Sequence, residues 1–242
     1  HSLGVVNRSL KELIKARYLD DSIRPSAKAI AEFKQKTPQR AVILAAGFGM
    51  RMVPINTEMP KGLLEVNGEP LIERIIKQLH EVGIKEIYVV VGFMKEKYEY
   101  LIDEYGVELV VNADYAAKNN LHSIKLVKEH LENAYIVPCD IWCDRNPFHQ
   151  HELYSWYMVS DFVDNESNVR VNRKMELVTV PKSSGGNAMI GICYLVKEDA
   201  DIVAGRIEEL CRDQRYDEAF WEESLYEKDR MIVAARVVHS SD

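Results

Sequence analysis

A glycine-rich stretch followed by basic residues is the first candidate for chemistry in this sequence. Residues 41–52 read AVILAAGFGMRM, so a run of strand-forming residues ends at Gly47 and Gly49, and Arg51 follows two residues later. Glycine lets a backbone approach a ligand closely, and successive backbone amides can form a nest for an anion. Arg51, and Lys61 further along the chain, would add fixed positive charge. This pattern indicates a site for phosphate groups.

Two common phosphate-binding loops do not fit this stretch. A dinucleotide fingerprint has a third glycine and runs directly into a helix, whereas Met50, Arg51 and Met52 follow Gly49 here, and Pro54 stands where a helix would continue. A Walker loop would need Gly-Lys-Ser or Gly-Lys-Thr, which the stretch lacks. What remains is a glycine loop in which the positive charges come from Arg51 and Lys61, at two separate positions in the chain.

The segments around this loop alternate between strand and helix patterns, which favours a mostly parallel sheet with helices on both faces. The expected strands are 41–46, 86–92, 107–112 and 134–140, and the expected helices are 71–83, 95–106 and 123–131. Ligands of such sheets bind at the carboxyl ends of the strands. The loop from Gly47 to Arg51, Gly92 and Asp140 all lie at such ends, so we expect them to converge.

Two longer stretches carry a resemblance to a known family. The stretch LAAGFGMRMVPINTEMPKGLLEVNGEPLIE, residues 44–73, resembles the signature of nucleotidyltransferases that join a nucleoside triphosphate to a phosphorylated small molecule. Residues 89–140 resemble bacterial CTP:phosphocholine cytidylyltransferases, above all in the Y-x-x-x-N-N-x-x-S segment from Tyr115 to Ser123. The resemblance is strong over residues 40–144 and looser over 185–238.

This resemblance implies a fold and a reaction. The fold is a Rossmann-like nucleotidyltransferase domain over residues 39–242, an α/β architecture with a mostly parallel mixed sheet flanked by helices. The reaction is transfer of a cytidylyl group from CTP to phosphocholine, which gives CDP-choline and pyrophosphate. A phosphate oxygen of the acceptor would attack the α-phosphorus in line. Such chemistry needs positioning and charge neutralisation rather than a covalent nucleophile.

The resemblance also implies roles for individual residues. Arg51 and Lys61 would be catalytic by stabilising charge on the α-phosphate, and Asp140 would be catalytic as the ligand of Mg²⁺. The residues implied in nucleotide binding are Leu44, Ala45, Ala46, Gly47, Phe48, Gly49, Met50, Arg51, Lys61, Gly92, Asn112, Tyr115, Asn119, Asn120 and Ser123. The family uses a second carboxylate close to a C-terminal strand. The sequence ends at Asp242, and the place of that second ligand stays open.

Recognition of choline would need aromatic faces around a trimethylammonium group, because such faces attract cations by about 0.5–2 kcal/mol per contact. The aromatic candidates are Trp221, Tyr194, Trp156 and Tyr154, together with Tyr157 next to Trp156. Trp221 is favoured because its hydrophobic-Trp-acidic segment is similar to the C-terminal helix of the family. Asp161, Glu222 and Glu223 could add attraction. Any one of these rings could equally be packed in the core.

The charge of the chain is unevenly spread, which favours a boundary near residue 38. Residues 1–40 hold 9 Lys/Arg and 4 Asp/Glu, whereas the other 202 residues hold 22 and 34. Segment 1–38 resembles the back half of a winged helix-turn-helix, with Asn7, Arg8 and Lys11 on the recognition helix, although a complete module needs more helices upstream. DNA contact through a complete module is one possibility. A helical arm packed on the main domain is the alternative.

Other functions remain open at this point. A sugar-1-phosphate nucleotidyltransferase would want hydroxyl-binding residues in place of aromatic ones, and a regulator would sense a nucleotide and bind DNA. Cys139, Cys143, His149 and His151 lie within 13 residues, but their spacing matches no common zinc finger. The sequence has four scattered cysteines and no apolar run near 18 residues, so we expect a cytoplasmic protein without a membrane span. Its oligomeric state is not indicated.

Overall fold

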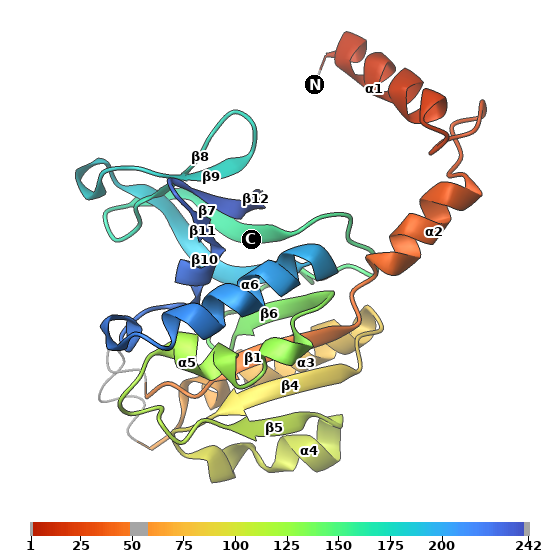
Figure 1. The fold of residues 1–242 in the computed structure, drawn as a ribbon. Helices are drawn as coiled ribbons and strands as arrows, with labels where there is room; N and C mark the ends of the chain where they lie inside the picture. The colour runs from red at the N-terminus through yellow and green to blue at the C-terminus, as the bar shows by residue number, and fades with distance from the viewer. Residues whose placement is uncertain (1, 49–57, 240–242) are drawn as a thin grey trace.

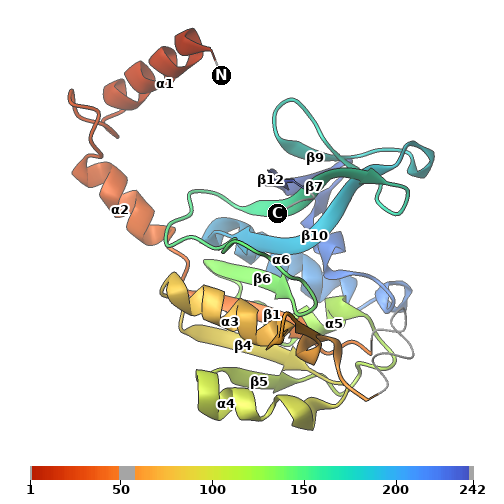
Figure 2. The same ribbon diagram turned by 180° about the vertical axis from the view of Figure 1, so that it is seen from behind.

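A mixed sheet between two layers of helices forms the body of the protein (Figures 1 and 2). The computed structural model describes residues 2–48 and 58–239. The strands are β1 Arg40–Ala45, β2 Glu65–Val66, β3 Glu69–Pro70, β4 Glu86–Val91, β5 Glu108–Val111, β6 Ala134–Pro138, β7 Trp156–Asp164, β8 Val169–Val171, β9 Glu176–Thr179, β10 Gly186–Leu195, β11 Tyr226–Glu227 and β12 Arg230–Val238. The α-helices are α1 Leu3–Lys15, α2 Ala27–Gln35, α3 Leu71–Glu81, α4 Tyr100–Tyr105, α5 Asn120–Lys125 and α6 Lys197–Leu210. None of these described helices is both long enough and apolar enough to cross a membrane.

The first half of the main sheet is parallel, as the alternating pattern predicted. Its strand order is β5-β4-β1-β6-β10-β7-β12-β9-β8, and β11 pairs with β12. Strands β5, β4, β1 and β6 run parallel, and β1 is in register with both neighbours, with Leu44 opposite Val90 and Pro138. Strand β10 then runs antiparallel to β6 and β7, while β12 runs parallel to β7. The expected mixed, mostly parallel nucleotidyltransferase sheet is confirmed.

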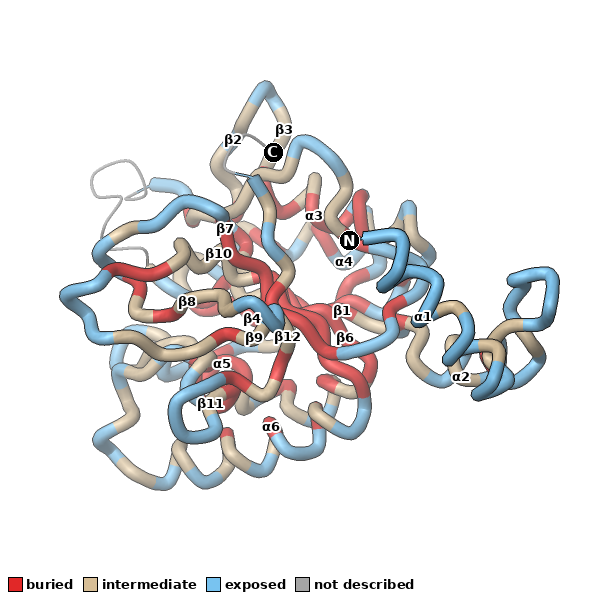
Figure 3. The backbone as a smooth tube through the Cα atoms, turned by 90° about the horizontal axis from the view of Figure 1, so that it is seen from above, coloured by how far each residue is buried: buried red, intermediate tan, exposed pale blue. Residues whose placement is uncertain are grey.

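The two faces of the sheet are covered by different helices (Figures 1 and 2). On one face, apolar residues of α3 and α4 pack against β1 and β4, with Ile72, Ile76 and Leu101 fully buried. On the other face, α5 and α6 supply Ile124 and Val203 to a second core layer. Figure 3 shows the buried strands in the middle of the molecule and exposed segments around them. These layers fix the strand ends from which the candidate site is built.

Two expected helices are shorter or differently placed than their sequence patterns suggest. The helix expected over 95–106 is a 3₁₀ turn, Lys95–Tyr98, followed by α4, and it begins after Met94 in a left-handed conformation at φ 50°. The helix expected over 123–131 begins earlier, at Asn120, because the Asn119 side chain caps it. A 3₁₀ turn, Lys128–His130, follows it. The patterns located these elements, and local capping set their ends.

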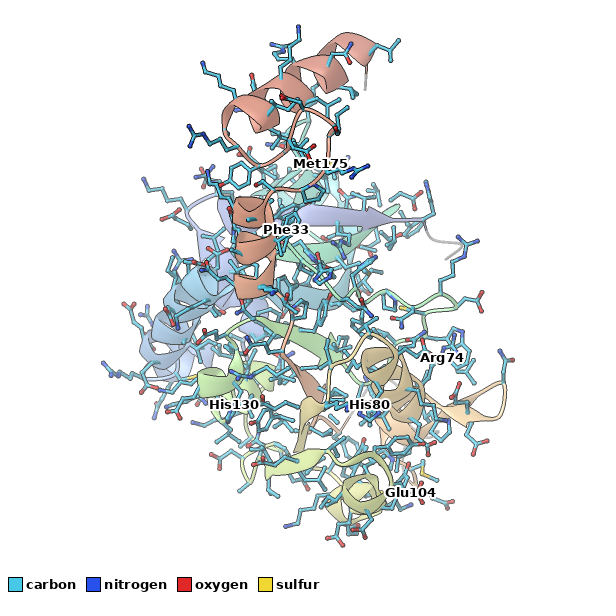
Figure 4. All side chains as sticks on the ribbon, turned by 90° about the vertical axis from the view of Figure 1, so that its right-hand side faces the viewer. Phe33, Arg74, His80, Glu104, His130 and Met175 are labelled. Carbon is cyan, nitrogen blue, oxygen red and sulfur yellow. The ribbon has the colours of Figure 1, made fainter. Side chains whose placement is uncertain are left out.

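The N-terminal segment consists of α1 and α2 joined by a turn in which Leu19 and Pro25 form an isolated bridge. It projects away from the body, as Figure 4 shows with Phe33 labelled on α2. Helix α1 buries none of its residues. The alternative of an arm packed on the main domain would require buried residues in this helix, so α1 does not fit that alternative. Two helices and a turn do not confirm a winged helix. That module, its DNA contact and the domain boundary after residue 38 stay predictions.

Candidate active site

The carboxyl ends of β1, β4 and β6 bring the first group of candidate residues to one edge of the sheet. Backbone hydrogen bonds hold the chain just beyond these strands: Phe93 N donates to the Ala46 carbonyl at 3.1 Å, and Cys139 N donates to the Leu44 carbonyl at 3.2 Å. Leu44, Ala45 and Ala46 therefore lie between the residues that follow β4 and those that follow β6. The expected convergence of the glycine loop, Gly92 and Asp140 holds for its described part.

Lys61 and Asp140 form an ion pair at this edge. The distance between Lys61 Nζ and Asp140 Oδ2 is 2.8 Å, and both side chains are partly open to solvent, with 23% and 33% of their areas exposed. The two residues lie 79 positions apart in the chain. The fold thus places a cation and a carboxylate side by side where a ligand of a parallel sheet would bind.

Gly62 explains how Lys61 reaches Asp140. Buried Pro60 leads into a 3₁₀ turn, Lys61–Leu63, which packs directly on the end of β6. A Cβ atom at Gly62 would lie 3.1 Å from both Cys139 Cβ and the Tyr98 hydroxyl, so only glycine fits there without a shift. Gly62 was not among the predicted site residues, although its position directly after Lys61 was a usable signal.

Cys139 belongs to the packing of this site rather than to its chemistry. It is buried, and burial, with the negative charge of Asp140, raises the pKa of its thiol well above the usual range. A neutral buried thiol is a poor nucleophile and a poor metal ligand. Within residues 2–48 and 58–239, the structure gathers no group of three or more His, Cys, Asp or Glu side chains that could hold a metal ion, and this includes Cys139, Cys143, His149 and His151.

Three aromatic residues, Phe48, Phe93 and Tyr115, lie close together at Gly92. The rings of Phe48 and Phe93 meet edge to face with centroids 4.5 Å apart, and Tyr115 lies 6.5 Å from Phe93. A Cβ atom at Gly92 would lie 2.6 Å from Tyr115 Cβ and 2.8 Å from the carbonyl oxygen of Ala46. Gly92 is therefore required for this close approach, and the structure brings Ala46, Phe48, Gly92 and Tyr115 together as one wall.

Replacing Gly92 with alanine should lower stability because the clash involves backbone and the root of a ring, neither of which can turn aside. We expect a loss of about 1–3 kcal/mol in the free energy of unfolding, as for an overpacked core. Urea unfolding would measure it. Gly205→Ala is the matched control, because its Cβ meets nothing within 4 Å on α6 and should stabilise by about 0.5–1 kcal/mol. Equal stability of the two variants would contradict this role for Gly92.

The remaining nucleotide candidates lie between β5 and α5. Asn112 follows β5, and its buried amide donates from Nδ2 to Ser123 Oγ at 3.0 Å. The Asn119 side chain donates to the Glu218 carbonyl at 3.0 Å, and Asn120 Oδ1 accepts from the backbone N–H of Trp221 at 2.8 Å. The structure thus places these four residues together, and the polar atoms named here form hydrogen bonds within the protein. Their contact with a base or ribose stays a prediction.

Three members of the glycine loop, Gly49, Met50 and Arg51, lie outside the described residues. Gly47 lies inside, just beyond β1. The catalytic role expected of Arg51 stays a prediction. Asp242, named above in connection with a second carboxylate, also lies outside the described residues.

The aromatic candidates fall into different places. Trp221 is 1% exposed and tilts against Tyr157 with ring centroids 6.3 Å apart. Tyr154 is 57% exposed and lies before β7. Trp156 and Tyr194 are fully buried beside Tyr135 at the start of β6, about 16 Å along the strand from Asp140. The structure does not bring Trp156 and Tyr194 to the Lys61–Asp140 edge.

Both of those buried rings are already engaged. The guanidinium of Arg236 lies 3.7 Å from the centroid of the Trp156 ring, so the cation–π contact there is made by the protein itself. The Tyr194 hydroxyl donates to the Lys36 carbonyl at 2.6 Å, which ties the chain before β1 to β10. A similar cation–π contact holds α3 to the segment after β6, where Arg74, labelled in Figure 4, lies 4.1 Å from the Trp142 ring.

A buried carboxylate lies next to Trp221. Glu222 Oε1 accepts a hydrogen bond from the Tyr157 hydroxyl at 2.8 Å, and Oε2 is buried without a hydrogen-bond partner among the residues that the structure describes. Burial raises the pKa of Glu222 above its usual value of 4.5. A carboxylate in this state favours a cation as its partner. The 213–225 segment lies on the side of the sheet to which β1 and β6 lead (Figure 1).

Comparison with known proteins agrees with this arrangement. A family model described as the MobA-like NTP transferase domain matches residues 41–155. A choline-phosphate cytidylyltransferase of Streptococcus pneumoniae is 45% identical over 118 residues, which cover 49% of this chain and 52% of that relative. The chain thus spans about half the length of this relative.

Two further relatives match over more of the chain. A 2-aminoethylphosphonate cytidylyltransferase of Lancefieldella rimae is 32% identical over 190 residues, covering 76% of this chain and 77% of that relative. A solved structure of a CTP:phosphocholine cytidylyltransferase from Streptococcus pneumoniae superposes with a TM-score of 0.75 at 28% identity, over 83% of this chain and 90% of that one. The chain belongs to the MobA-like NTP transferase family of the nucleotidyltransferase superfamily.

Proposed function

We propose that this protein transfers the cytidylyl group of CTP to phosphocholine and releases CDP-choline and pyrophosphate. The observation that carries the proposal is the Lys61–Asp140 pair, 2.8 Å apart at the carboxyl ends of the parallel strands. The names of the relatives support it, because two of them describe cytidylyl transfer to choline phosphate and to 2-aminoethylphosphonate. Both acceptors join an anionic phosphorus group to a cationic amine.

The reaction asks little covalent chemistry of the protein. An oxygen of the acceptor phosphate attacks the α-phosphorus of CTP, a new P–O bond forms, and the bond to the β-phosphate oxygen breaks with its electron pair on pyrophosphate. Negative charge increases on the oxygens around the α-phosphorus. The Lys61 ammonium, fixed by the turn at Gly62, would neutralise that charge, and Arg51 is proposed to share this work.

Asp140 would be the protein ligand of a Mg²⁺ ion. Its carboxylate fits that role because Mg²⁺ takes one or two carboxylates from a protein and fills its remaining positions with water and substrate phosphates. A bound ion would neutralise phosphate charge. Lys61 Nζ donates a hydrogen bond to Asp140 Oδ2. When the triphosphate and its metal ion bind, Lys61 must therefore move away from this oxygen or share it with the ion.

The acceptor's cationic group is assigned to the neighbourhood of Trp221 and Glu222. Glu222 has a buried carboxylate oxygen, and the rings of Trp221 and Tyr157 pack beside it, each only 1% exposed, so the segment would have to open for a cation to reach them. A trimethylammonium group cannot donate hydrogen bonds, so charge attraction and ring faces are what a site can use to hold it.

Glu222→Gln should weaken acceptor binding selectively. We expect KM for phosphocholine to rise about ten- to a hundredfold, because loss of a buried charge partner costs about 1.5–3 kcal/mol, while KM for CTP stays nearly constant. Steady-state kinetics with each substrate varied would show the split. Glu223→Gln is the control, because Glu223 is the exposed neighbour. An unchanged acceptor KM in Glu222→Gln would contradict the assignment.

The same carboxylate predicts a pH dependence. Because burial raises the pKa of Glu222 above 4.5, its charge is lost as the pH falls through that raised value, and the acceptor should then bind more weakly. The ratio of acceptor KM between wild type and Glu222→Gln should approach one at low pH, because protonated Glu222 is neutral like glutamine. Titration of the acceptor itself affects both proteins equally and cancels in this ratio. A ratio that stays constant as the pH is lowered to 4.5 would contradict this prediction.

An acceptor panel tests the proposed function as a whole. CTP or UTP would be incubated with phosphocholine, 2-aminoethylphosphonate or glucose 1-phosphate, and the nucleotide product identified by chromatography. We expect the highest kcat/KM for CTP with phosphocholine. Preference for 2-aminoethylphosphonate would overturn the acceptor, preference for glucose 1-phosphate would favour the sugar alternative, and no product with any acceptor would overturn cytidylyl transfer.

A further inference from the structure

Two adjacent asparagines tie the beginning of α5 to the segment that precedes and includes Trp221. Asn120 Oδ1 accepts from the backbone N–H of Trp221 at 2.8 Å across 101 residues of chain. Asn119 Nδ2 donates to the Glu218 carbonyl at 3.0 Å, and the Asn119 backbone N–H donates to the Asp217 carbonyl at 2.7 Å. Residues 217–221 are therefore held by hydrogen bonds from both asparagine side chains.

The start of a helix is suited to this attachment. Its first backbone N–H groups have no partner within the helix and must find acceptors elsewhere. Asn119 Oδ1 accepts from the N–H of Asn120 at 2.7 Å, and the Ala219 carbonyl accepts from the N–H of Leu121 at 3.4 Å. The segment that contains Ala219 thus completes the hydrogen bonding of α5, and each element orders the other.

An ion pair with Lys118 and a close approach of His122 accompany the attachment at Asp217. Asp217 Oδ1 lies 3.1 Å from His122 Nε2 and 3.4 Å from Lys118 Nζ, and the His122 side chain is only 9% exposed. The 217–221 segment is consequently fixed along its length, and the position of Trp221 and Glu222 follows from the position of α5.

Helix α5 is also tied to the other half of the site. Ser123, one turn after Asn120, accepts the hydrogen bond from Asn112 at 3.0 Å, and Asn112 N in turn donates to the Val91 carbonyl at 2.8 Å, directly before Gly92. A continuous path of hydrogen bonds therefore runs from the end of β4, through Asn112 and α5, to Trp221.

We propose that Asn120, supported by Asn119, is a positioning residue that fixes the Trp221–Glu222 segment for the acceptor. This inference rests on the proposed function, because it takes Glu222 as part of the acceptor site. It gives the asparagine pair a role in acceptor binding that differs from direct contact with the base and ribose. The oxygen of Asn120 that could read a nucleotide is engaged by Trp221.

The proposal predicts a split between the two substrates. Asn120→Leu removes the acceptor oxygen opposite the Trp221 N–H, so the 217–225 segment should move and KM for the acceptor should rise about tenfold or more. The dissociation constant for CTP, measured by calorimetry, should change by less than about threefold. Asn120→Asp keeps an oxygen at the same place and should restore the acceptor KM to near the wild-type value.

A matched control separates this role from general loss of stability. Asn146 is half-buried like Asn120, and its Oδ1 also accepts a hydrogen bond from one backbone N–H, that of Phe148, at 3.0 Å. No hydrogen bond described for Asn146 involves the 217–221 segment. Asn146→Leu should therefore lower the midpoint of thermal unfolding without a selective effect on acceptor KM. If Asn120→Leu does not fold, Asn120→Ser, which withdraws the oxygen without adding apolar bulk, should give the same split in smaller measure.

Amide hydrogen exchange of the full chain gives a readout that does not depend on activity. The Trp221 N–H should exchange faster in Asn120→Leu than in wild type, and at the wild-type rate in Asn120→Asp. Unchanged exchange at residues 217–221 would overturn the attachment itself. Faster exchange with an unchanged acceptor KM, or with CTP affinity reduced as much as acceptor affinity, would overturn the positioning role. Absence of turnover in the wild type with every acceptor would instead count against the proposed function alone.

Discussion

Lys61→Ala is expected to lower kcat by about 10²–10³ while the dissociation constant for CTP rises only a few fold. The reason is that the Lys61 ammonium neutralises charge that grows on the α-phosphate in the transition state, and removing one such preorganised group typically has this effect on turnover. The triphosphate of bound CTP keeps its other contacts. Pre-steady-state turnover of CTP and calorimetric binding of CTP would measure the two quantities separately.

A matched lysine shows whether the effect belongs to the site. Lys77 Nζ also forms an ion pair at 2.9 Å, with Glu69 Oε1, but on the outer side of α3. Lys77→Ala should leave kcat unchanged within about twofold, since exposed ion pairs contribute little. Lys61→Arg keeps the charge with a different shape and should recover only part of the rate. Near-normal turnover in Lys61→Ala would remove Lys61 from the mechanism.

Asp140→Asn is expected to give the second large loss. The substitution preserves the shape of the side chain and an oxygen that can accept from Lys61, but it removes the negative charge that a divalent cation requires. We expect kcat to fall by about 10² or more at fixed Mg²⁺ and the Mg²⁺ concentration at half-maximal rate to rise. A titration of activity against Mg²⁺ at saturating CTP, with Mn²⁺ binding followed by electron paramagnetic resonance, would measure both effects.

Asp144 provides the control for this substitution. Asp144 lies four residues after Asp140 and is exposed. Its backbone carbonyl accepts a hydrogen bond from the Arg74 side chain at 2.7 Å, so its carboxylate is not needed for that contact. Asp144→Asn should therefore keep both the rate and the Mg²⁺ dependence of the wild type. If Asp140→Asn has the same Mg²⁺ dependence as Asp144→Asn, Asp140 does not hold the metal ion.

The sequence predicted the parallel half of the fold and the convergence of the glycine loop, Gly92 and Asp140 at one edge of the sheet. Alternating strands and helices imply parallel strands, and the carboxyl ends of parallel strands share one edge, so Gly92 and Asp140 had to lie near each other. The predicted nucleotidyltransferase family is confirmed by the comparisons. The nearness of Gly92 and Asp140 could be predicted because it depends on strand direction, and the alternation of strands with helices in the sequence indicates parallel strands.

The acceptor side could not be predicted in the same way. Trp156 and Tyr194 have the residue type of a choline site, but they lie at the start of β6 and pack in the core. Their place depends on the antiparallel pairing of β10 with β6, which no pattern in residues 156–195 indicated. The hydrogen bond from Trp221 to Asn120 joins residues 101 positions apart, and long-range pairing of this kind is invisible to local periodicity.

One measurement tests the central claim most directly: the fate of the phosphorus atoms of CTP. CTP labelled at either the α- or the γ-phosphorus would be incubated with phosphocholine, Mg²⁺ and the full chain, and the products separated. In-line attack at the α-phosphorus predicts that the α label appears in CDP-choline and the γ label in pyrophosphate, in equal amounts. Release of the γ label as inorganic phosphate, or of the α label as CMP without CDP-choline, would contradict cytidylyl transfer by this protein.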